Sequence, residues 1–139
     1  MIQKIDFNSI PIMYDVVGCC FKVHKKLGTH VLERAYKLGL MVELRRMGYE
    51  VKEEEFIDMY YDGEIIPKAF RCDLLVNGTL IVELKATEEL NREHHSQLST
   101  YMEMSHIPYG VLVNFHEPLL KNGLSRKCLD EQFHIIKTI

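Results

Sequence analysis

The sequence predicts an α/β domain whose mixed central β-sheet contains an antiparallel three-stranded meander and is flanked by helices. Three observations indicate this fold class. Two stretches near the start have apolar residues at helical spacing, and three extended runs separated by turn residues follow them. A further helical stretch then leads into a strand rich in Val and Leu. Because a helix between two extended runs implies a parallel crossover, the sheet should have antiparallel and parallel neighbours.

Two helices are expected before the strands. In residues 12–27 apolar side chains recur three to four positions apart, and Gly28 follows. A second helix is expected over residues 31–47, where the same spacing recurs before Gly48.

The remaining elements follow from turn residues and breakers. Asp62-Gly63 is a strong hairpin signal, Asn77-Gly78-Thr79 turns the chain again, and Pro108 ends a helix. The expected elements are strands 50–61, 64–76 and 80–86, helix 91–105, strand 109–115, and a last edge strand within 133–139.

Length and charge limit the function classes. The chain has 139 residues, which fits one domain spanning residues 1–139. The formal net charge is -3, so the protein is not a globally basic nucleic-acid binder. Contact with phosphates would therefore require local basic patches or bound cations.

The cysteines and the apolar runs indicate a cytoplasmic protein. The four cysteines form no CxxC pair, so we expect reduced, packed thiols rather than a zinc site. The first residues lack a basic region followed by a long apolar run, and no window approaches the ~18 apolar residues of a membrane span.

The stretch RCDLLVNGTLIVELKA, residues 71–86, places charged residues inside two apolar strands. Because strand side chains alternate between faces, a three-residue turn at 77–79 would place Asp73 opposite Glu83, on the face that Lys85 also occupies. A two-residue Asn-Gly turn would instead pair Asp73 with Val82, unless a bulge restored the register. The first register is favoured because it collects the apolar residues on one face, namely Leu74, Val76, Leu80, Val82 and Leu84.

Two converging carboxylates repel each other, and the pKa of one rises unless a cation lies between them. Oxygen ligands of this kind suit Mg²⁺ or Mn²⁺, and Lys85 could hold a water or a phosphate oxygen beside the metal. The alternative interpretation is a surface salt-bridge cluster on a half-exposed antiparallel sheet.

Asp73 followed by Glu83-Leu84-Lys85 resembles the PD-(D/E)XK nuclease superfamily. Gln97 and Tyr101 resemble the Q-x-x-x-Y element of its RecB-type members. Glu33 and Tyr36, on the second predicted helix, resemble the motif of a small stand-alone family named GxxExxY. The resemblance covers roughly residues 11–116 and implies a restriction-endonuclease-like core. The chain departs from the family at His30, which replaces the glycine of the motif, and at His116, where small residues are usual.

The resemblance implies a divalent-metal-dependent nuclease that hydrolyses phosphodiester bonds. Asp73 and Glu83 would hold Mg²⁺ (or Mn²⁺), with the carbonyl of Leu84 as a further ligand, and Glu33 would approach the metal directly or through water. Lys85 would position the attacking water. The residues expected to orient this lysine or contact substrate are Gln97, Tyr101, His94 and Arg71.

Several of these residues have a simpler interpretation. Glu33 could be an exposed acid on an amphipathic helix, His94 a solvated helix histidine, and Arg71 the partner of a salt bridge to Glu33 or Glu83. Tyr101 could pack and brace Gln97. Three basic groups could contact a nucleic acid or form solvated faces: Lys22, Lys25 and Lys26; Arg45 and Arg46; Arg126 and Lys127.

Nucleic acid is the expected partner, with DNA favoured over RNA, and pairing of two copies as a homodimer is a further hypothesis. The alternative function is a catalytically silent nuclease-fold module for binding or assembly. The acidic net charge favours this alternative, whereas the intact set Asp73, Glu83, Lys85 and Gln97 favours an enzyme.

Overall fold

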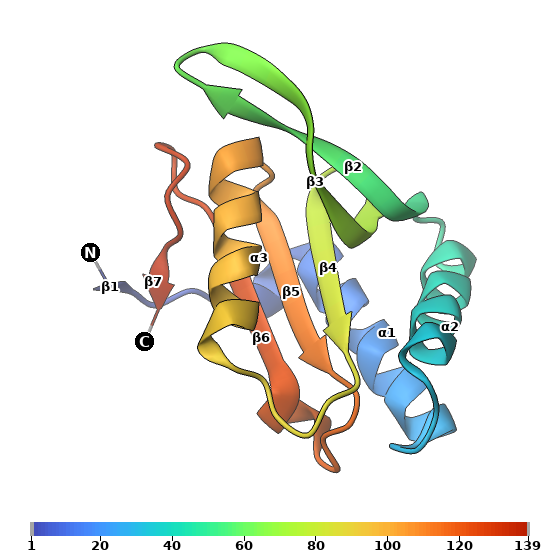
Figure 1. Ribbon diagram of the computed structural model, residues 1–139. Helices are drawn as coiled ribbons and strands as arrows, with labels where there is room; N and C mark the ends of the chain where they lie inside the picture. Colours follow the sequence, from blue (N-terminus) through green and yellow to red (C-terminus); the bar gives the residue numbers. More distant parts are fainter. Residues whose placement is uncertain (1, 139) are drawn as a thin grey trace.

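A computed structural model describes residues 2–138 and confirms the predicted fold class, an α/β domain with helices on a mixed sheet (Figure 1). In chain order the elements are β1 (Ile2–Gln3), η1 (Phe7–Ser9), α1 (Pro11–Leu27), α2 (Glu33–Arg46), β2 (Val51–Tyr61), β3 (Glu64–Val76), β4 (Leu80–Lys85), α3 (Arg92–Ser105), β5 (Tyr109–Asn114), η2 (Leu120–Gly123), β6 (Leu124–Cys128) and β7 (Lys137–Thr138).

The central sheet has five strands in the order β2-β3-β4-β5-β6. Strands β2, β3 and β4 form the predicted antiparallel meander, and β5 lies parallel to β4 after the crossover through α3. The β2–β3 hairpin extends past the rest of the sheet at its upper end (Figure 1).

Both faces of this sheet are covered. Helices α1 and α2 pack on one face, over a buried cluster that includes Leu74, Val82 and Leu84. Helix α3 packs on the other face, over Ile81 and Leu112. The face that carries Glu83 is therefore not half-exposed, as the surface-cluster interpretation required, because α3 covers it.

The bend between α1 and α2 depends on Gly28. Its φ of 70° is in the left-handed region that favours glycine, and its carbonyl accepts a hydrogen bond from the Tyr36 hydroxyl at 2.6 Å. The fully buried Tyr36 ring stacks on Phe115 at 4.6 Å between centroids. Gly28 thus supplies the bend although the motif's own glycine position is His30.

The last edge strand was wrongly predicted. The edge next to β5 is β6, Leu124–Cys128, which pairs antiparallel with β5. Of the predicted segment 133–139, only Lys137–Thr138 forms a strand, β7, which pairs with β1 in a separate two-stranded sheet, and residue 139 lies outside the described residues. An edge strand that is only half buried needs little apolar surface. The β6 sequence Leu-Ser-Arg-Lys-Cys therefore lacks the apolar alternation by which a strand is predicted.

The four cysteines are free and buried, as predicted. Among residues 2–138, no helix has both the length and the apolar character needed to cross a membrane.

The packing of α3 on β5 depends on Gly110, which faces Met102 and Leu98 without a side chain of its own. A Cβ at Gly110 would overlap the Met102 sulfur and come within 3.1 Å of Leu98 Cδ1. We expect Gly110→Ala to lower the free energy of unfolding by about 1–3 kcal/mol through overpacking, as measured by urea denaturation.

Gly18→Ala is the matched control, since a Cβ there meets nothing within 4 Å. In the interior of α1 this change should raise stability by roughly 0.5–1 kcal/mol. Equal stability of the Gly110→Ala variant and the parent protein would contradict the close α3–β5 packing.

Candidate active site

The turn between β3 and β4 sets the register that sequence analysis favoured. Val76 pairs with Leu80 and Leu74 with Val82, so one further step along the strands places Asp73 opposite Glu83. The three-residue turn contains two consecutive positive φ angles, 49° at Asn77 and 66° at Gly78. This register is confirmed, and it depends on a turn of odd length.

Beyond the Leu74–Val82 pair, side chains replace backbone partners between β3 and β4. The Leu84 N–H donates to Asp73 Oδ2 at 2.9 Å, and the Asp73 N–H donates to Glu83 Oε1 at 3.3 Å. Each carboxyl group thus accepts a hydrogen bond from the opposite strand. The two acids are held together where the strands separate, so their predicted convergence is confirmed.

At Asp73 the side chains of β3 switch from one face of the sheet to the other. Phe70 and Cys72 pack in the α3-side cluster, whereas Leu74 and Val76 pack in the cluster under α1 and α2. Residues two apart along a regular strand share a face, so the strand must twist or bend at Asp73.

The environment of Glu83 is unfavourable for a negative charge. Its exposed fraction is 4%. Burial, and then the charge of Asp73, raise the pKa of Glu83 to about 9, while the ammonium of Lys85 has a smaller opposing effect. Near neutral pH the pair therefore retains a proton, unless a cation takes its place.

Lys85 follows at the carboxyl end of β4 and is partly exposed. Among the described residues it forms no ion pair. Its carbonyl accepts a hydrogen bond from the Phe115 N–H at 2.9 Å, which ties the end of β4 to β5.

The contribution of Asn114 was not predicted from the sequence. This fully buried amide at the end of β5 accepts from the Thr87 N–H at 3.1 Å and donates to the Thr87 carbonyl at 2.8 Å. It therefore fixes the start of the loop that follows Lys85. The signal in the sequence was a single polar residue closing an otherwise apolar strand.

Two residues of α3, Gln97 and Tyr101, contact each other. Gln97 Nε2 donates to the Tyr101 hydroxyl at 2.9 Å, and the Tyr101 ring stacks on Phe70 at 4.1 Å between centroids. The pKa of Tyr101 is raised by burial and then by the charge of Glu83. Tyr101 both packs and contacts Gln97, as the bracing interpretation expects.

The structure does not bring all predicted residues together. Glu33 is the first residue of α2 and is exposed, and the described part of the chain contains no group of three or more His, Cys, Asp or Glu side chains arranged to hold a metal. His94 Nδ1 accepts from the Asn91 N–H at 3.2 Å in a capping box at the start of α3. Arg71 forms an ion pair at 3.1 Å with Glu54, which is neither of the partners considered from sequence.

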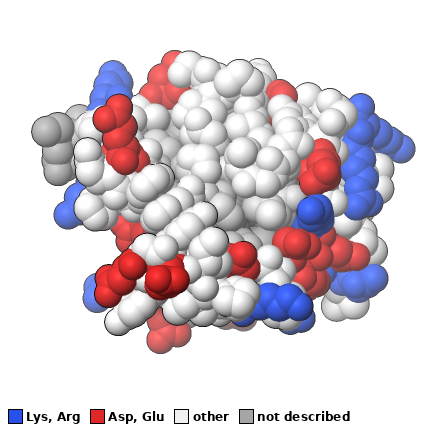
Figure 2. Space-filling view, turned by 90° about the horizontal axis from the view of Figure 1, so that it is seen from above, with Lys and Arg blue, Asp and Glu red and all other residues white. Residues whose placement is uncertain are grey.

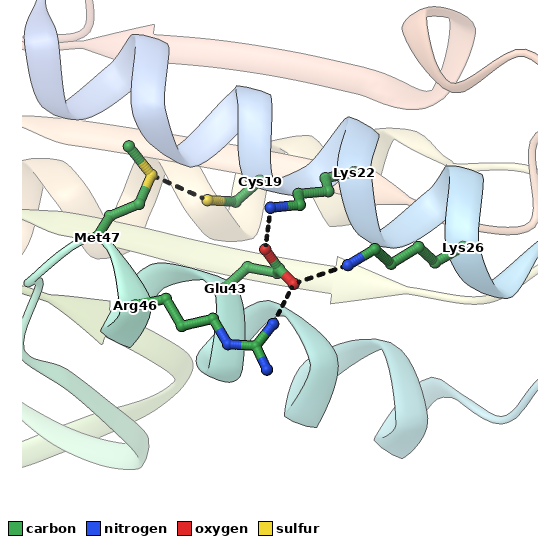
Figure 3. A network of polar contacts seen from close by, with 6 residues as sticks. All are labelled: Cys19, Lys22, Lys26, Glu43, Arg46 and Met47. Carbon is green, nitrogen blue, oxygen red and sulfur yellow. Dashed lines mark hydrogen bonds and ion pairs between the residues drawn. The ribbon is translucent and has the colours of Figure 1, made fainter.

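The basic residues of α1 and α2 surround a buried acid. Lys22, Lys26 and Arg46 lie 2.8–3.3 Å from the Glu43 carboxylate (Figure 3). The hydrogen bond from Lys22 is the main cause that lowers the pKa of Glu43, and a pocket of about 410 Å³ lies beside this network.

The charge distribution shows no broad basic surface in the view from above, where basic and acidic side chains alternate around a largely uncharged centre (Figure 2). Of the other basic residues, Arg45 donates to the Val51 carbonyl and Arg126 to Asn8 Oδ1. Several of the candidate phosphate contacts therefore already have partners within the chain.

A family sequence model described as the PD-(D/E)XK nuclease superfamily matches residues 11–127 of the chain. The chain belongs to the PD-(D/E)XK nuclease superfamily. Comparison with curated proteins and with solved structures gave no significant match. The mixed sheet with its flanking helices is consistent with the restriction-endonuclease-like fold of this superfamily. The matched range contains the acids, the lysine and the glutamine whose arrangement is described above.

The raised pKa of Glu83 has a consequence for stability without metal. A carboxyl group whose pKa is higher in the folded than in the unfolded state stabilises the fold below its unfolded pKa, and this stabilisation is lost as pH rises through about 9. We expect the free energy of unfolding in EDTA to fall between pH 5 and pH 9 by at most ~1.4 kcal/mol per pH unit.

In Glu83→Gln this fall should be largely absent, because the amide does not ionise. Glu93→Gln, at an exposed position of α3, is the control and should keep the fall. Urea denaturation at several pH values measures all three proteins. Parallel pH profiles of Glu83→Gln and the parent protein would contradict the assignment.

Proposed function

We propose that the chain is a divalent-metal-dependent nuclease of the GxxExxY branch of its superfamily. The observation that carries this proposal is the contact between Asp73 and the buried Glu83 at the point where β3 and β4 separate, next to Lys85. A buried carboxyl group with a raised pKa, such as that of Glu83, is typical of functional sites, because it is unfavourable for stability alone.

The residues present fit a hard divalent cation. Asp73, Glu83 and the Leu84 carbonyl offer oxygen ligands, and Mg²⁺ or Mn²⁺ would offset the repulsion between the carboxylates. Glu33 is proposed as a more distant contributor through water. Such an ion, if bound there, would lower the pKa of a water ligand and offset charge on a phosphate.

The side chains around the acids have complementary roles. Lys85 would hold the attacking water and stabilise the negative charge that develops on the phosphate oxygens. The Leu84 N–H fixes Asp73. Gln97, held by Tyr101, would orient the Lys85 ammonium or donate to the phosphate, while Arg71 and His94 would contact the substrate farther along its backbone.

We propose nucleic acid as substrate, with DNA favoured over RNA, in a cytoplasmic setting. The net charge of -3 makes general electrostatic attraction weak, so binding would depend on the metal and a few cations near the site. Pairing of two copies as a homodimer would extend the surface that contacts the substrate.

One observation favours a catalytically silent binding or assembly module instead. The exposed Glu33 does not join Asp73 and Glu83 in a three-acid group within the described residues. A silent module would bind metal or partners at this pocket without cleaving a phosphodiester bond.

A cleavage assay distinguishes the two functions. Labelled single-stranded DNA, duplex DNA and RNA are incubated with the parent protein, Asp73→Asn and Lys85→Ala in Mg²⁺, Mn²⁺ or EDTA. We expect metal-dependent cleavage by the parent protein and a loss of about 100- to 1,000-fold in each variant, the range for removing one group that stabilises transition-state charge.

Glu93→Gln controls for the preparation and should cleave like the parent protein. Absence of cleavage by all proteins would reject the nuclease proposal and leave the silent module. Equal cleavage by all of them would show a contaminating activity and remove the assigned roles of Asp73 and Lys85.

A further inference from the structure

A buried lysine joins α2 to β2. Lys37 is 8% exposed, and its ammonium lies 2.9 Å from Glu54 Oε1 and 3.3 Å from Glu53 Oε2. The hydrogen bond to Glu54 is the main cause that raises the pKa of Lys37, and the same bond lowers the pKa of Glu54, so the pair is ionised near neutral pH. None of the roles described above uses this lysine.

Its partner Glu54 has an unusual backbone. The φ of Glu54 is 50°, a left-handed value that a side chain disfavours, and strain of this kind persists only where surrounding contacts impose it. The Glu54 carboxylate has ion-pair contacts on two sides, with Lys37 at 2.9 Å and with Arg71 at 3.1 Å. Lys37 is the buried partner, whereas the Arg71 side chain is 57% exposed.

This irregular residue stands opposite Asp73. The β2–β3 ladder runs from Glu53 paired with Leu74 to Glu55 paired with Cys72, and the intervening pair, Glu54 with Asp73, is missing. On its other side Asp73 has lost its backbone partner on β4 as well, since its N–H donates to the Glu83 side chain. At this place Asp73 therefore has no backbone ladder partner on either neighbouring strand, and side chains alone join it to β4.

We propose that Lys37 is a positioning residue, which holds the irregular backbone at Glu54 and thereby keeps Asp73 turned out of the β2–β3 ladder and toward β4. The consequence for metal binding rests on the proposed function, but the consequence for the hydrogen bond from the Leu84 N–H to Asp73 does not. An ordinary structural ion pair would affect the stability of the whole domain rather than this one contact.

The test compares Lys37→Met with Lys37→Arg, which keeps the charge. Lys52→Met is the matched control, because Lys52 lies on β2 beside the acids that Lys37 contacts and pairs with an acid, Glu50, at 3.8 Å on the surface. Amide hydrogen exchange of the metal-free proteins is followed by NMR. Mn²⁺ affinity is measured by titration calorimetry at pH 8, and unfolding by urea.

We expect Lys37→Met to speed exchange of the Leu84 amide about tenfold, the change for losing a hydrogen bond to a charged group, while Val82 and Val111 keep their rates. Mn²⁺ affinity should fall by about 10- to 100-fold, as for other residues that orient a metal ligand. Lys37→Arg should restore both quantities, and Lys52→Met should leave both unchanged.

A second variant distinguishes the positioning role of Lys37 from general misfolding. In Glu54→Gly the positive φ carries no strain, so adding Lys37→Met to it should change Leu84 exchange much less than in the parent protein. Unchanged Leu84 exchange in Lys37→Met, or equal acceleration of all amides, would overturn the positioning role. Absence of Mn²⁺ binding by the parent protein would overturn the proposed function alone, because the exchange measurement needs no metal.

Discussion

The separation of β3 from β4 after the Leu74–Val82 pair is the constraint on which the candidate site depends. From that point the strands are joined by two carboxyl groups, each accepting a backbone N–H of the opposite strand. A regular ladder would satisfy these N–H groups with carbonyls and would leave no oxygen atoms facing one another. The irregularity therefore creates an oxygen-rich position inside an otherwise apolar sheet.

Three other features of the domain contribute to the surroundings of this position. Helix α3 covers the sheet face that carries Glu83, whose pKa is raised by burial. Asn114 fixes the loop after Lys85, and Lys37 forms ion pairs with Glu53 and Glu54 of β2. The arrangement is unfavourable for stability in the absence of a cation, because a buried acid is placed beside another acid. Divalent metal would relieve this cost, which links the fold of the hairpin to the chemistry expected of the superfamily.

Much of the fold could be predicted from the sequence, for identifiable reasons. The odd turn at Asn77-Gly78-Thr79 fixed which residues share a face, and breakers such as Pro108 marked the ends of elements. Strand β6 escaped prediction because its polar residues carry no periodic signal. The irregularity at Glu54 and the ion pair with Lys37 also escaped, since a positive φ at a glutamate and a contact across 17 residues leave no local pattern. The exposed position of Glu33 depends on how α2 packs, which no spacing rule determines.

The most direct test of the central claim is a crystal structure of the protein soaked with Mn²⁺, with anomalous diffraction used to locate the metal. We predict an anomalous peak between the carboxyl groups of Asp73 and Glu83, within coordination distance (about 2.0–2.3 Å) of at least one oxygen from each. A peak elsewhere on the chain, or hydrogen-bonded carboxyl groups with no metal between them at saturating Mn²⁺, would contradict it.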